Sequence, residues 1–432
     1  PAAAAELPVA TAPPVAAAPP VAAATPPGAF AGAVRHLYVH VPFCAARCDY
    51  CDYVSHVVPP AAGAGARRPE GVCASGSRAV WRSTGGRDAD LFDAYVAAAV
   101  AEWHHQRAAH GVRRLETLYL GGGTPALLGA ARLERLVGVV APWLTPRAEV
   151  TVETNPDEAD EAFAAWAGAR GVRVSLGVQS FDPDLRAALG RRPAADPAAA
   201  VRRLRAAGVR DLSLDLIWGI PGQTARDLEA DLAWLAALAP DHVSWYELDV
   251  APGTPLARRL AGPTARGEQP TASICDDERA ALFRLVVRGL EHLGYRWYEV
   301  SNFARPGRRA RHNLAYWRAR PYLGLGPGAV STVGHRRWRN VPDLEAYLAA
   351  PPGRPPREVE ELDDAALARE RLMLAARCGL RVPLAEVAAG VAAPALAPLR
   401  RAGLLSLHSG TIRVTRKGRS VANEVCVRLF RA

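Results

Sequence analysis

The chain has 432 residues, half of them hydrophobic, so it can bury a sizeable core and form one large domain with a smaller one. Its 53 basic and 43 acidic residues give a net charge of +10, but arginine supplies nearly all of the positive charge and no long basic run marks a nucleic-acid-binding arm. Seven cysteines are too few, and odd in number, for the disulfide framework of a secreted protein, which excludes that class.

Residues 1–33 form an Ala/Pro/Val-rich tract that cannot cover an apolar face, and we expect it to be disordered. Prolines interrupt its apolar stretch, so it predicts no membrane span. Glu6 is its only charged residue, so it has the features of neither a secretory signal nor a transit peptide. We therefore expect a cytoplasmic protein.

From residue 34 to residue 270, short apolar runs rich in β-forming residues alternate with stretches of helical spacing. This alternation predicts a parallel sheet with helical crossovers, as either a partial barrel or a doubly wound sheet. Strands are expected at His36–Val41, Thr117–Leu120, Glu149–Glu153, Val172–Val178, Leu212–Ile217 and His242–Leu248, and helices at Asp90–His110, Ala131–Ala141, Glu158–Ala169, Pro197–Ala207 and Arg226–Ala239.

Residues 59–86 interrupt this rhythm with Gly, Pro, Ser and Arg, and we expect a mobile insertion there. Cys73 lies inside it and is expected to be an incidental loop thiol. The other cysteines outside the cluster described below, Cys275, Cys378 and Cys426, are expected to be small core residues.

Residues 271–350 continue the barrel with a predicted helix at Asp276–Leu293 and a predicted strand at Arg296–Val300. A Pro/Gly-rich stretch near residues 350–356 then separates off the rest of the chain. Residues 357–432 have the order helix, short helix, helix, ribbon and helix, which predicts a small winged-helix-like α+β domain.

Three cysteines, Cys44, Cys48 and Cys51, follow the first predicted strand at spacings of four and three residues. On a loop they can converge on one centre, and soft thiolates suit iron–sulfur clusters and zinc. A [4Fe–4S] cube held by three cysteines keeps one iron open for another ligand, such as the amine and carboxylate of S-adenosylmethionine. Reduction at the cluster can then cleave S-adenosylmethionine to a 5′-deoxyadenosyl radical. Buried free thiols and a structural zinc site, with His40 or His56 as fourth ligand, are the alternatives.

The pattern C-x-x-x-C-x-x-C, with an aromatic residue before the last cysteine, resembles the signature of the radical S-adenosylmethionine (SAM) superfamily. The string LYVHVPFC at residues 37–44 resembles the subgroup that contains oxygen-independent coproporphyrinogen III dehydrogenase and the HemW-type heme chaperone. The likeness covers nearly all of residues 35–430. It implies an α/β fold, a partial parallel (β/α)6 TIM-like barrel, with a [4Fe–4S] cluster on the three cysteines and SAM beside it.

Glycines and polar residues follow the predicted strands at the ends where parallel barrels bind ligands. The second strand leads into a glycine run whose backbone can approach a ligand closely. Each residue alone could equally be a tight turn or a strand-end hydrogen-bonding group. Together they match the family pattern, and the resemblance implies SAM contacts from Tyr38 at the sulfonium, from Gly122, Gly123 and Thr124 at the methionyl amino group, and from Glu153, Gln179, Arg191 and Asp215 elsewhere on the nucleoside.

Two features distinguish the chaperone from the dehydrogenase. The dehydrogenase carries an additional cysteine two positions beyond the cluster motif, where this chain has Tyr53 after Asp52. Residues 312–317, HNLAYW, resemble the H-N-x-x-Y-W motif that the chaperone branch associates with heme. From the residues alone, a buried histidine among core aromatics is the alternative. The resemblance implies heme contacts from His312, Asn313, Tyr316 and Trp317.

Two positions depart from the family pattern. Pro193 stands where a histidine usually follows the Leu-Gly-Arg step, and Val330 stands where a histidine commonly follows the glycine run at residues 324–328. This chain therefore lacks whatever those two histidines contribute in relatives.

Three hypotheses follow. The first is a heme chaperone that binds the cluster and SAM as cofactors and heme as its cargo. It takes electrons from a donor and delivers heme to an acceptor protein. Transient contact with a membrane-bound acceptor is compatible with this hypothesis. The second is an oxygen-independent coproporphyrinogen III dehydrogenase, which abstracts hydrogen from propionate side chains. The third is a regulatory or nucleic-acid-binding protein with a structural cluster, whose winged helix would bind DNA. The basic residues considered for this role are Arg400, Arg401, Arg413, Arg416, Lys417 and Arg419. We expect the first, with the capacity for SAM cleavage and no nucleic-acid partner.

Overall fold

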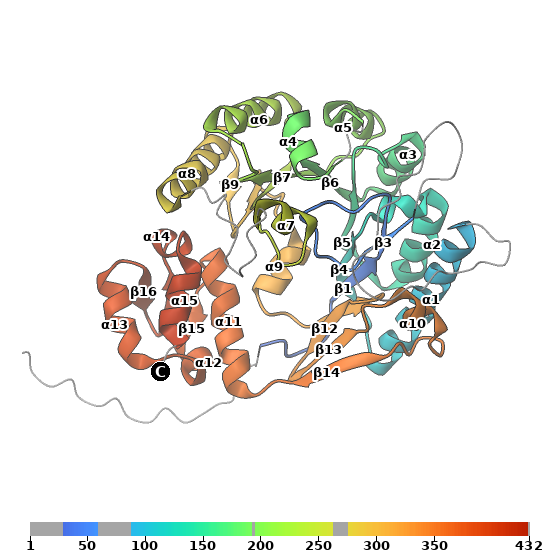
Figure 1. Cartoon of the computed structure of the whole chain (residues 1–432). Coiled ribbons are helices and arrows are strands. Elements are labelled where there is room, and N and C mark those ends of the chain that lie inside the picture. The colour runs from blue at the N-terminus through green and yellow to red at the C-terminus, as the bar shows by residue number, and fades with distance from the viewer. Residues whose placement is uncertain (1–28, 59–87, 192–194, 262–274, 431–432) are drawn as a thin grey trace, which may run out of the picture.

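The computed structural model describes residues 29–58, 88–191, 195–261 and 275–430, and it is built around one sheet of twelve strands (Figure 1). The strand order is β14-β13-β12-β11-β1-β4-β5-β6-β7-β8-β10-β9. The six strands β1 and β4 to β8 are all parallel and adjacent in chain order. They are β1 (His36–Val41), β4 (Leu115–Gly122), β5 (Leu144–Thr154), β6 (Arg173–Gln179), β7 (Leu212–Trp218) and β8 (His242–Glu247).

The strand order decides between a partial barrel and a doubly wound sheet, the two arrangements that the alternation of strands and helices left open. A doubly wound sheet reverses its strand order near the middle, whereas a barrel adds each new strand on the same side of the last one. Here each of the six parallel strands is added on the same side, so the partial (β/α)6 barrel is confirmed. Within the described residues the barrel is open, because its sheet ends at β14 on one edge and at β9 on the other.

Long helices lie on the outer face of the parallel strands (Figure 1). In α3 the Asp160 carboxylate accepts a hydrogen bond from the Phe163 amide at 2.7 Å, and Gly171 ends the helix in the left-handed conformation. In α6 a capping box joins Thr224 and Asp227. The helices are α1 (Asp88–Ala109), α2 (Ala130–Val140), α3 (Glu161–Arg170), α4 (Pro183–Ala188), α5 (Pro197–Ala206), α6 (Ala225–Leu238), α7 (Pro255–Ala261) and α8 (Asp276–His292).

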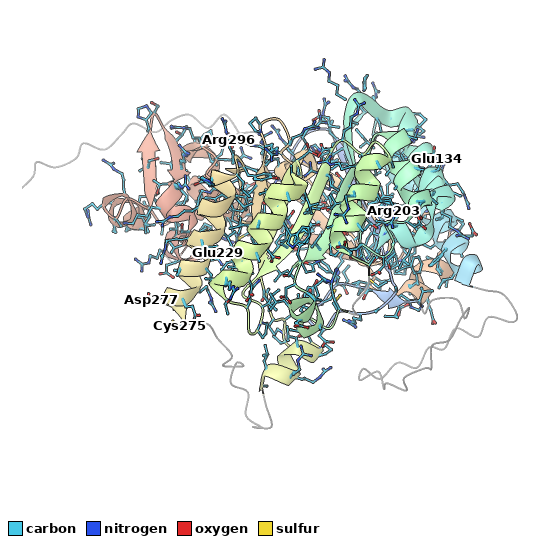
Figure 2. The ribbon with its side chains drawn as sticks, turned by 90° about the horizontal axis from the view of Figure 1, so that it is seen from above. Glu134, Arg203, Glu229, Cys275, Asp277 and Arg296 are labelled. Atoms are coloured by element: carbon cyan, nitrogen blue, oxygen red, sulfur yellow. The ribbon has the colours of Figure 1, made fainter. Side chains whose placement is uncertain are left out.

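This helical layer is charged on one side and apolar on the other. Seen from above, Glu134 of α2, Arg203 of α5 and Glu229 of α6 project from the outer helices (Figure 2). On the opposite faces Leu133 of α2 and Leu228 of α6 are fully buried in the core that they share with the sheet. The core therefore lies between sheet and helices and holds the inner surface of the barrel in place.

Later segments extend both edges of the sheet. β10 pairs antiparallel with β8, while β11 lies parallel to β1 and continues into an antiparallel meander. The strand predicted at residues 296–300 is shorter than expected. Helix α9 lies at the N-terminal ends of β4 and β5, where the His312 amide donates to the Glu149 carboxylate at 2.9 Å. The elements are β9 (Arg296–Trp297), β10 (Asn302–Ala304), α9 (Arg311–Trp317), β11 (Tyr322–Leu325), β12 (Val330–Val333), β13 (Arg336–Asn340), α10 (Leu344–Ala349) and β14 (Arg357–Glu361).

The residues after β14 have a core of their own. Some of the basic side chains considered for DNA binding pack against the barrel instead. Arg416 pairs with Glu291 of α8 at 2.8 Å, and the Arg419 guanidinium lies 3.9 Å from the ring centre of Trp297. The elements are α11 (Asp364–Cys378), β15 (Val382–Pro383), α12 (Leu384–Val387), α13 (Ala393–Arg401), β16 (Leu405–His408), β17 (Thr411–Val414), α14 (Arg416–Arg419) and α15 (Ala422–Phe430).

Cys378 and Cys426 are buried in this small unit, as expected. The prediction that Cys275 is a core residue is wrong, because it precedes the first turn of α8 and is exposed there (Figure 2). The predicted tail up to residue 28, the insertion at residues 59–86 with its cysteine, and Pro193 lie outside the described residues. None of the described helices is long and apolar enough to cross a lipid bilayer.

Candidate functional site at the ends of the barrel strands

The cysteine loop follows β1 and is fixed to the barrel at its base. β2 (Phe43–Cys44) pairs with β3 (His56–Val57) on the far side of the loop. The Gly123 amide donates to the Val41 carbonyl at 2.8 Å, which ties the end of β4 to the start of the loop. Three thiols thereby line one cavity at the C-terminal ends of the strands, those of Cys44, Cys48 and Cys51.

The donor set of this loop fits an iron–sulfur cluster better than a zinc ion. Burial raises the pKa of the Cys44 thiol to about 11, so the thiol keeps its proton until a metal displaces it. Of the two histidines considered for zinc, His40 has both ring nitrogens engaged, with the Tyr38 hydroxyl at 3.0 Å and the Val54 carbonyl at 2.8 Å, and His56 is exposed. No three His, Cys, Asp or Glu side chains of the described residues are placed to hold one metal ion, whereas a cube offers each thiolate its own iron.

The end of β4 brings backbone groups to the same cavity. Gly122 has a φ of +109°, which favours glycine, and a Cβ at this position would overlap with the ring of His40. A Cβ on Gly123 would overlap with the carbonyl oxygen of Phe43. These two glycines therefore let β4 pass directly beneath the cysteine loop and leave their backbone groups beside the cavity.

Two partly buried carboxylates lie on the inner face of the barrel. Glu153, at the end of β5, accepts hydrogen bonds from the Tyr119 hydroxyl at 2.6 Å and the Gly122 amide at 3.0 Å. Burial, reinforced by the nearby Asp215, raises the pKa of Glu153 to about 7. Asp215 lies in the middle of β7, deeper than the strand-end position expected, and accepts from the Ser175 hydroxyl at 2.8 Å. Burial raises the pKa of Asp215 as well.

A bulge and a returning arginine complete the wall of the cavity. Gln179 has a φ of +68° where β6 and β7 shift register, and the bulge turns its side chain toward the cavity. Arg191 donates to the Gly177 carbonyl at 2.6 Å and to Asn155 Oδ1 at 3.1 Å. Its Nε is enclosed and has no hydrogen-bond partner. Arg191 lines the cavity, so its guanidinium places positive charge beside a bound ligand.

The predicted SAM contacts, with one exception, line a single cavity with a volume of about 380 Å³. The sequence analysis did not single out Asn155, whose amide donates to Thr124 Oγ1 at 2.9 Å and whose oxygen accepts from Arg191. Its position two residues after Glu153, at a strand end, was the available signal. The contacts brought together with the three thiols are Gly122, Gly123, Thr124, Glu153, Gln179, Arg191 and Asp215.

Tyr38 is the exception. It lines a neighbouring cavity together with Tyr316 and with Val330, the residue that replaces a family histidine. Asp52 and Tyr53 border both cavities, so only the cysteine loop separates them. A contact between Tyr38 and the sulfonium group stays a prediction.

The segment expected to bind heme lies on α9, and its histidine is fully enclosed. His312 Nδ1 lies 2.7 Å from Thr117 Oγ1, and its Nε2 lies 3.0 Å from the Tyr316 hydroxyl. Burial lowers the pKa of His312 to about 3, and burial lowers that of its neighbour His36 to about 4, so both rings are neutral at pH 7. Iron ligation by His312 stays a prediction, and it would require one of its two hydrogen bonds to break.

The other three residues of this motif face different surroundings. Asn313 lines the central cavity, whereas Tyr316 lines the cavity that contains Tyr38. The indole nitrogen of Trp317 is enclosed without a hydrogen-bond partner. A short helix presents successive residues to different sides, and so these residues do not all line one cavity.

Two family models match the chain. The radical SAM superfamily matches residues 38–235, which contain the cysteine loop and nearly all of the parallel strands, and the HemN C-terminal domain matches residues 362–421. Curated relatives match over most of the chain. The heme chaperone HemW of Mycobacterium tuberculosis (strain H37Rv) is 37% identical over 396 residues, which are 90% of this chain and 93% of the relative.

Further relatives and a solved structure agree with this match. The heme chaperone HemW of Bacillus subtilis is 29% identical over 406 residues, covering 91% of this chain and 98% of the relative. The structure of coproporphyrinogen III oxidase (HemN) from Escherichia coli, described as a radical SAM enzyme, matches with a TM-score of 0.72 over 92% of this chain and 90% of that one. At 23% identity, the latter similarity concerns the fold.

Proposed function

This chain belongs to the radical SAM superfamily and, within it, to the family of the heme chaperone HemW, and from that premise we propose that it binds heme and delivers it to an acceptor protein. The superfamily implies a [4Fe–4S] cluster and SAM. The observation that carries the proposal is the meeting of three thiols with Glu153, Gln179, Arg191 and Asp215 in one cavity.

Each group of residues has its own task in this proposal. Cys44, Cys48 and Cys51 would hold three irons of the cluster and leave the fourth for the amine and carboxylate of SAM. When bound and reduced, the cluster supplies an electron that can cleave the sulfonium. The backbone of Gly122 and Gly123 would lie against the methionyl group.

The other side chains would orient the nucleoside. Glu153 and Asp215 supply partly buried oxygen acceptors, and the guanidinium of Arg191 supplies positive charge for an anionic group. Gln179 can offer both a donor and an acceptor. Hydrogen bonds join Glu153 to Tyr119, Asp215 to Ser175 and Arg191 to Asn155. These bonds fix the three cavity side chains before a ligand arrives.

A heme chaperone also needs a heme site, an electron donor for the cluster and a heme acceptor. We assign α9, with His312, Asn313, Tyr316 and Trp317, to the region that forms the heme site, and we propose that the protein works in the cytoplasm. A membrane-bound acceptor is compatible with this proposal.

The alternative is a coproporphyrinogen III dehydrogenase. The absence of the additional cysteine at Tyr53 and the names of the relatives favour the chaperone. Anaerobic reconstitution of the cluster, heme titration and an assay for coproporphyrinogen decarboxylation separate the two functions. We expect heme binding without decarboxylation. Turnover with release of a vinyl product would replace the chaperone with the dehydrogenase.

A further inference from the structure

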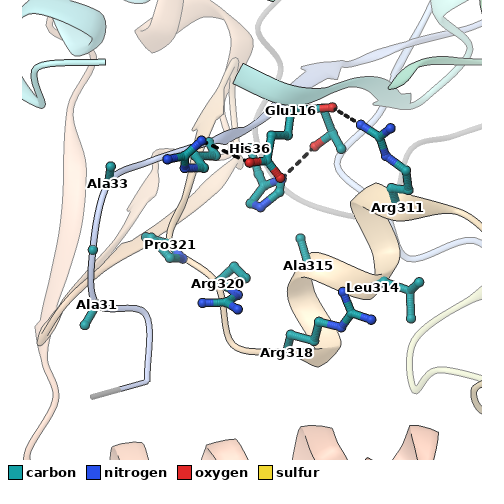
Figure 3. A pocket seen from close by; sticks show the side chains of 13 residues that line it. Ala31, Ala33, His36, Glu116, Arg311, Leu314, Ala315, Arg318, Arg320 and Pro321 are labelled. Atoms are coloured by element: carbon teal, nitrogen blue, oxygen red, sulfur yellow. Dashed lines mark hydrogen bonds and ion pairs between the residues drawn. The ribbon is translucent and has the colours of Figure 1, made fainter. Parts of the chain in front are cut away.

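A second cavity, with a volume of about 410 Å³, lies at the opposite end of the barrel. Its wall is formed by the start of β1 and β4, the residues just before β1, and one side of α9 with the turn that follows it (Figure 3). Its volume lies within the range of roughly 300–1,000 Å³ typical of cofactor sites, and the cavity is open to solvent. Nothing in the cysteine-lined site uses it.

A neutral imidazole faces this cavity. The ring of His36, at the first position of β1, lies on the cavity wall (Figure 3). Its Nδ1 lies 3.0 Å from Thr117 Oγ1. Its Nε2 makes no hydrogen bond to any described residue and is not among the enclosed unpartnered atoms, so solvent or a ligand can reach it.

The hydroxyl of Thr117 links the tautomer of His36 to that of His312. One hydroxyl lies between His36 Nδ1 and His312 Nδ1, so it accepts from one ring and donates to the other. If His36 Nδ1–H donates to Thr117, the hydroxyl donates to His312, and His312 Nε2–H donates to Tyr316. This arrangement leaves a lone pair on His36 Nε2, as a metal-ligating histidine requires.

The same cavity offers positive charge beside an apolar surface. Arg35 is paired with Glu116, but no acidic side chain of the described residues pairs with Arg318 or Arg320, which lie on the cavity wall (Figure 3). The apolar part of the wall comes from Ala31, Ala33, Leu314, Ala315 and Pro321. A planar apolar ligand with carboxylate groups fits such a surface.

The geometry points to this cavity as the heme site: His36 Nε2 ligates the iron of an iron porphyrin, and Arg318 and Arg320 bind its carboxylates. The inference rests on the proposed heme-chaperone function and deepens it by moving the iron ligand from His312 to His36. His312 becomes a positioning residue, which acts through Thr117 on the tautomer of His36. This role uses His312 without breaking its hydrogen bonds.

The arrangement separates heme from the cluster along one strand. Five residue steps lead from His36 at the start of β1 to Val41 at its end, roughly 17 Å at about 3.3 Å per residue. The cysteine loop begins directly beyond. Heme and SAM can therefore be bound at the same time, one at each end of the barrel.

Ligation is tested by titrating heme into the anaerobically reconstituted full chain. We expect His36→Ala to change the position of the Soret band and to weaken heme binding by about tenfold or more, with free imidazole restoring the wild-type band. The matched control is His408→Ala, which removes an exposed histidine from the C-terminal unit. SAM binding by each variant reports on the integrity of the barrel.

Binding of the porphyrin carboxylates is tested by replacing Arg318 and Arg320. Both side chains are exposed, so their removal should leave the fold intact. The double variant Arg318→Ala/Arg320→Ala is expected to weaken both heme and iron-free protoporphyrin IX by about tenfold. The double variant Arg400→Ala/Arg401→Ala, which removes two exposed charges on α13, should leave both affinities unchanged.

The outcomes separate this inference from the proposed function. Wild-type protein that binds no heme contradicts the proposed function itself. Wild-type protein that binds heme, together with a His36→Ala variant of unchanged Soret band and affinity, contradicts only the location of the heme site. Loss of porphyrin binding in the Arg318/Arg320 variant, with the Arg400/Arg401 variant unaffected, supports that location even if His36→Ala fails to fold.

Discussion

The two ends of the barrel offer opposite chemistry to a ligand. At the C-terminal ends of the strands, thiols and the partly buried carboxylates of Glu153 and Asp215 supply soft ligands and acceptors, which suit iron and a cationic nucleoside. At the N-terminal ends, Arg318, Arg320 and the neutral ring of His36 supply donors and one open nitrogen, which suit an anionic metal complex.

The difference teaches how the proposed sites would let one small barrel hold two unlike cofactors. Because the two groups of charges lie at opposite ends of the strands, neither ligand has to compete for the other's contacts. The first end is built from a loop and from the C-terminal ends of strands. The second depends on α9, a helix that follows the parallel strands of the barrel in the chain. The comparison fails if a change at one end abolishes binding at both.

The largest expected effect comes from removing a cluster ligand. Cys48→Ala should abolish the visible absorbance of the reconstituted protein, because two thiolates cannot hold a three-cysteine cube. Iron and labile-sulfide analysis measures this loss. Cys275→Ala, which removes an exposed thiol that does not line the cavity, should leave both contents unchanged. If Cys48→Ala keeps a full cluster, the assignment of this loop is wrong.

The next effect concerns the carboxylate that closes the same cavity. Glu153→Gln should weaken SAM binding by about 10- to 100-fold, because hydrogen bonds to a charged group are worth roughly 1.5–3 kcal/mol. The pKa of Glu153 is raised to about 7, so the carboxylate is largely neutral below that pH and ionised above it. SAM affinity should therefore rise with pH through about 7 in the wild type.

Calorimetric titration at several pH values measures both parts of this prediction. The Glu153→Gln variant cannot ionise, so its affinity should not follow pH in this range. An equally pH-dependent variant would show that another group is responsible.

A smaller effect is expected at the other end of the barrel. Thr117→Val keeps the shape of the side chain but leaves ring nitrogens of His36 and His312 without a partner, which should lower the free energy of unfolding by about 1–3 kcal/mol. Urea unfolding measures the change. Thr145→Val, at a half-buried position of β5, is the control. Equal stability of the two variants would contradict the hydrogen-bonded arrangement.

The smallest expected effect is that of a substitution at one end of the barrel on ligand affinity at the other end. The Arg318→Ala/Arg320→Ala variant should bind SAM within about twofold of the wild type, because exposed charges this far apart are screened by salt. Conversely, Cys48→Ala should still bind heme. Titration of each ligand into each variant makes the comparison, and a large loss in the unaltered site would mean that the two ends form one site.

Sequence reasoning found the first end of the barrel far better than the second. Periodicity located all six parallel strands, because each is a short apolar run between helices. The thiols and strand-end residues lie in compact motifs, so Glu153 and Gln179 could be named before their cavity was known. Asp215 was expected at the strand end although the predicted strand Leu212–Ile217 already contained it, and the structure confirms the start of that strand.

The second cavity had no such signal. Its walls come from residues 31–36, 116–117 and 311–321, which only the fold brings together. The environment of His312 could not be predicted either, because Thr117 is distant in sequence and looks like an ordinary strand residue. The start of α8 at Asp276 was predicted correctly, so the exposure of Cys275 was missed because the cysteine was judged by its residue type and not by its place just before the helix.

The most direct test of the central claim is an iron, sulfide and zinc determination on the anaerobically reconstituted chain, followed by an electron paramagnetic resonance spectrum of the reduced protein with and without SAM. We predict about four irons and four sulfides per chain, and a spectrum that changes when SAM binds the open iron. Zinc in place of iron and sulfide, or a cluster spectrum that SAM leaves unchanged, would contradict the account.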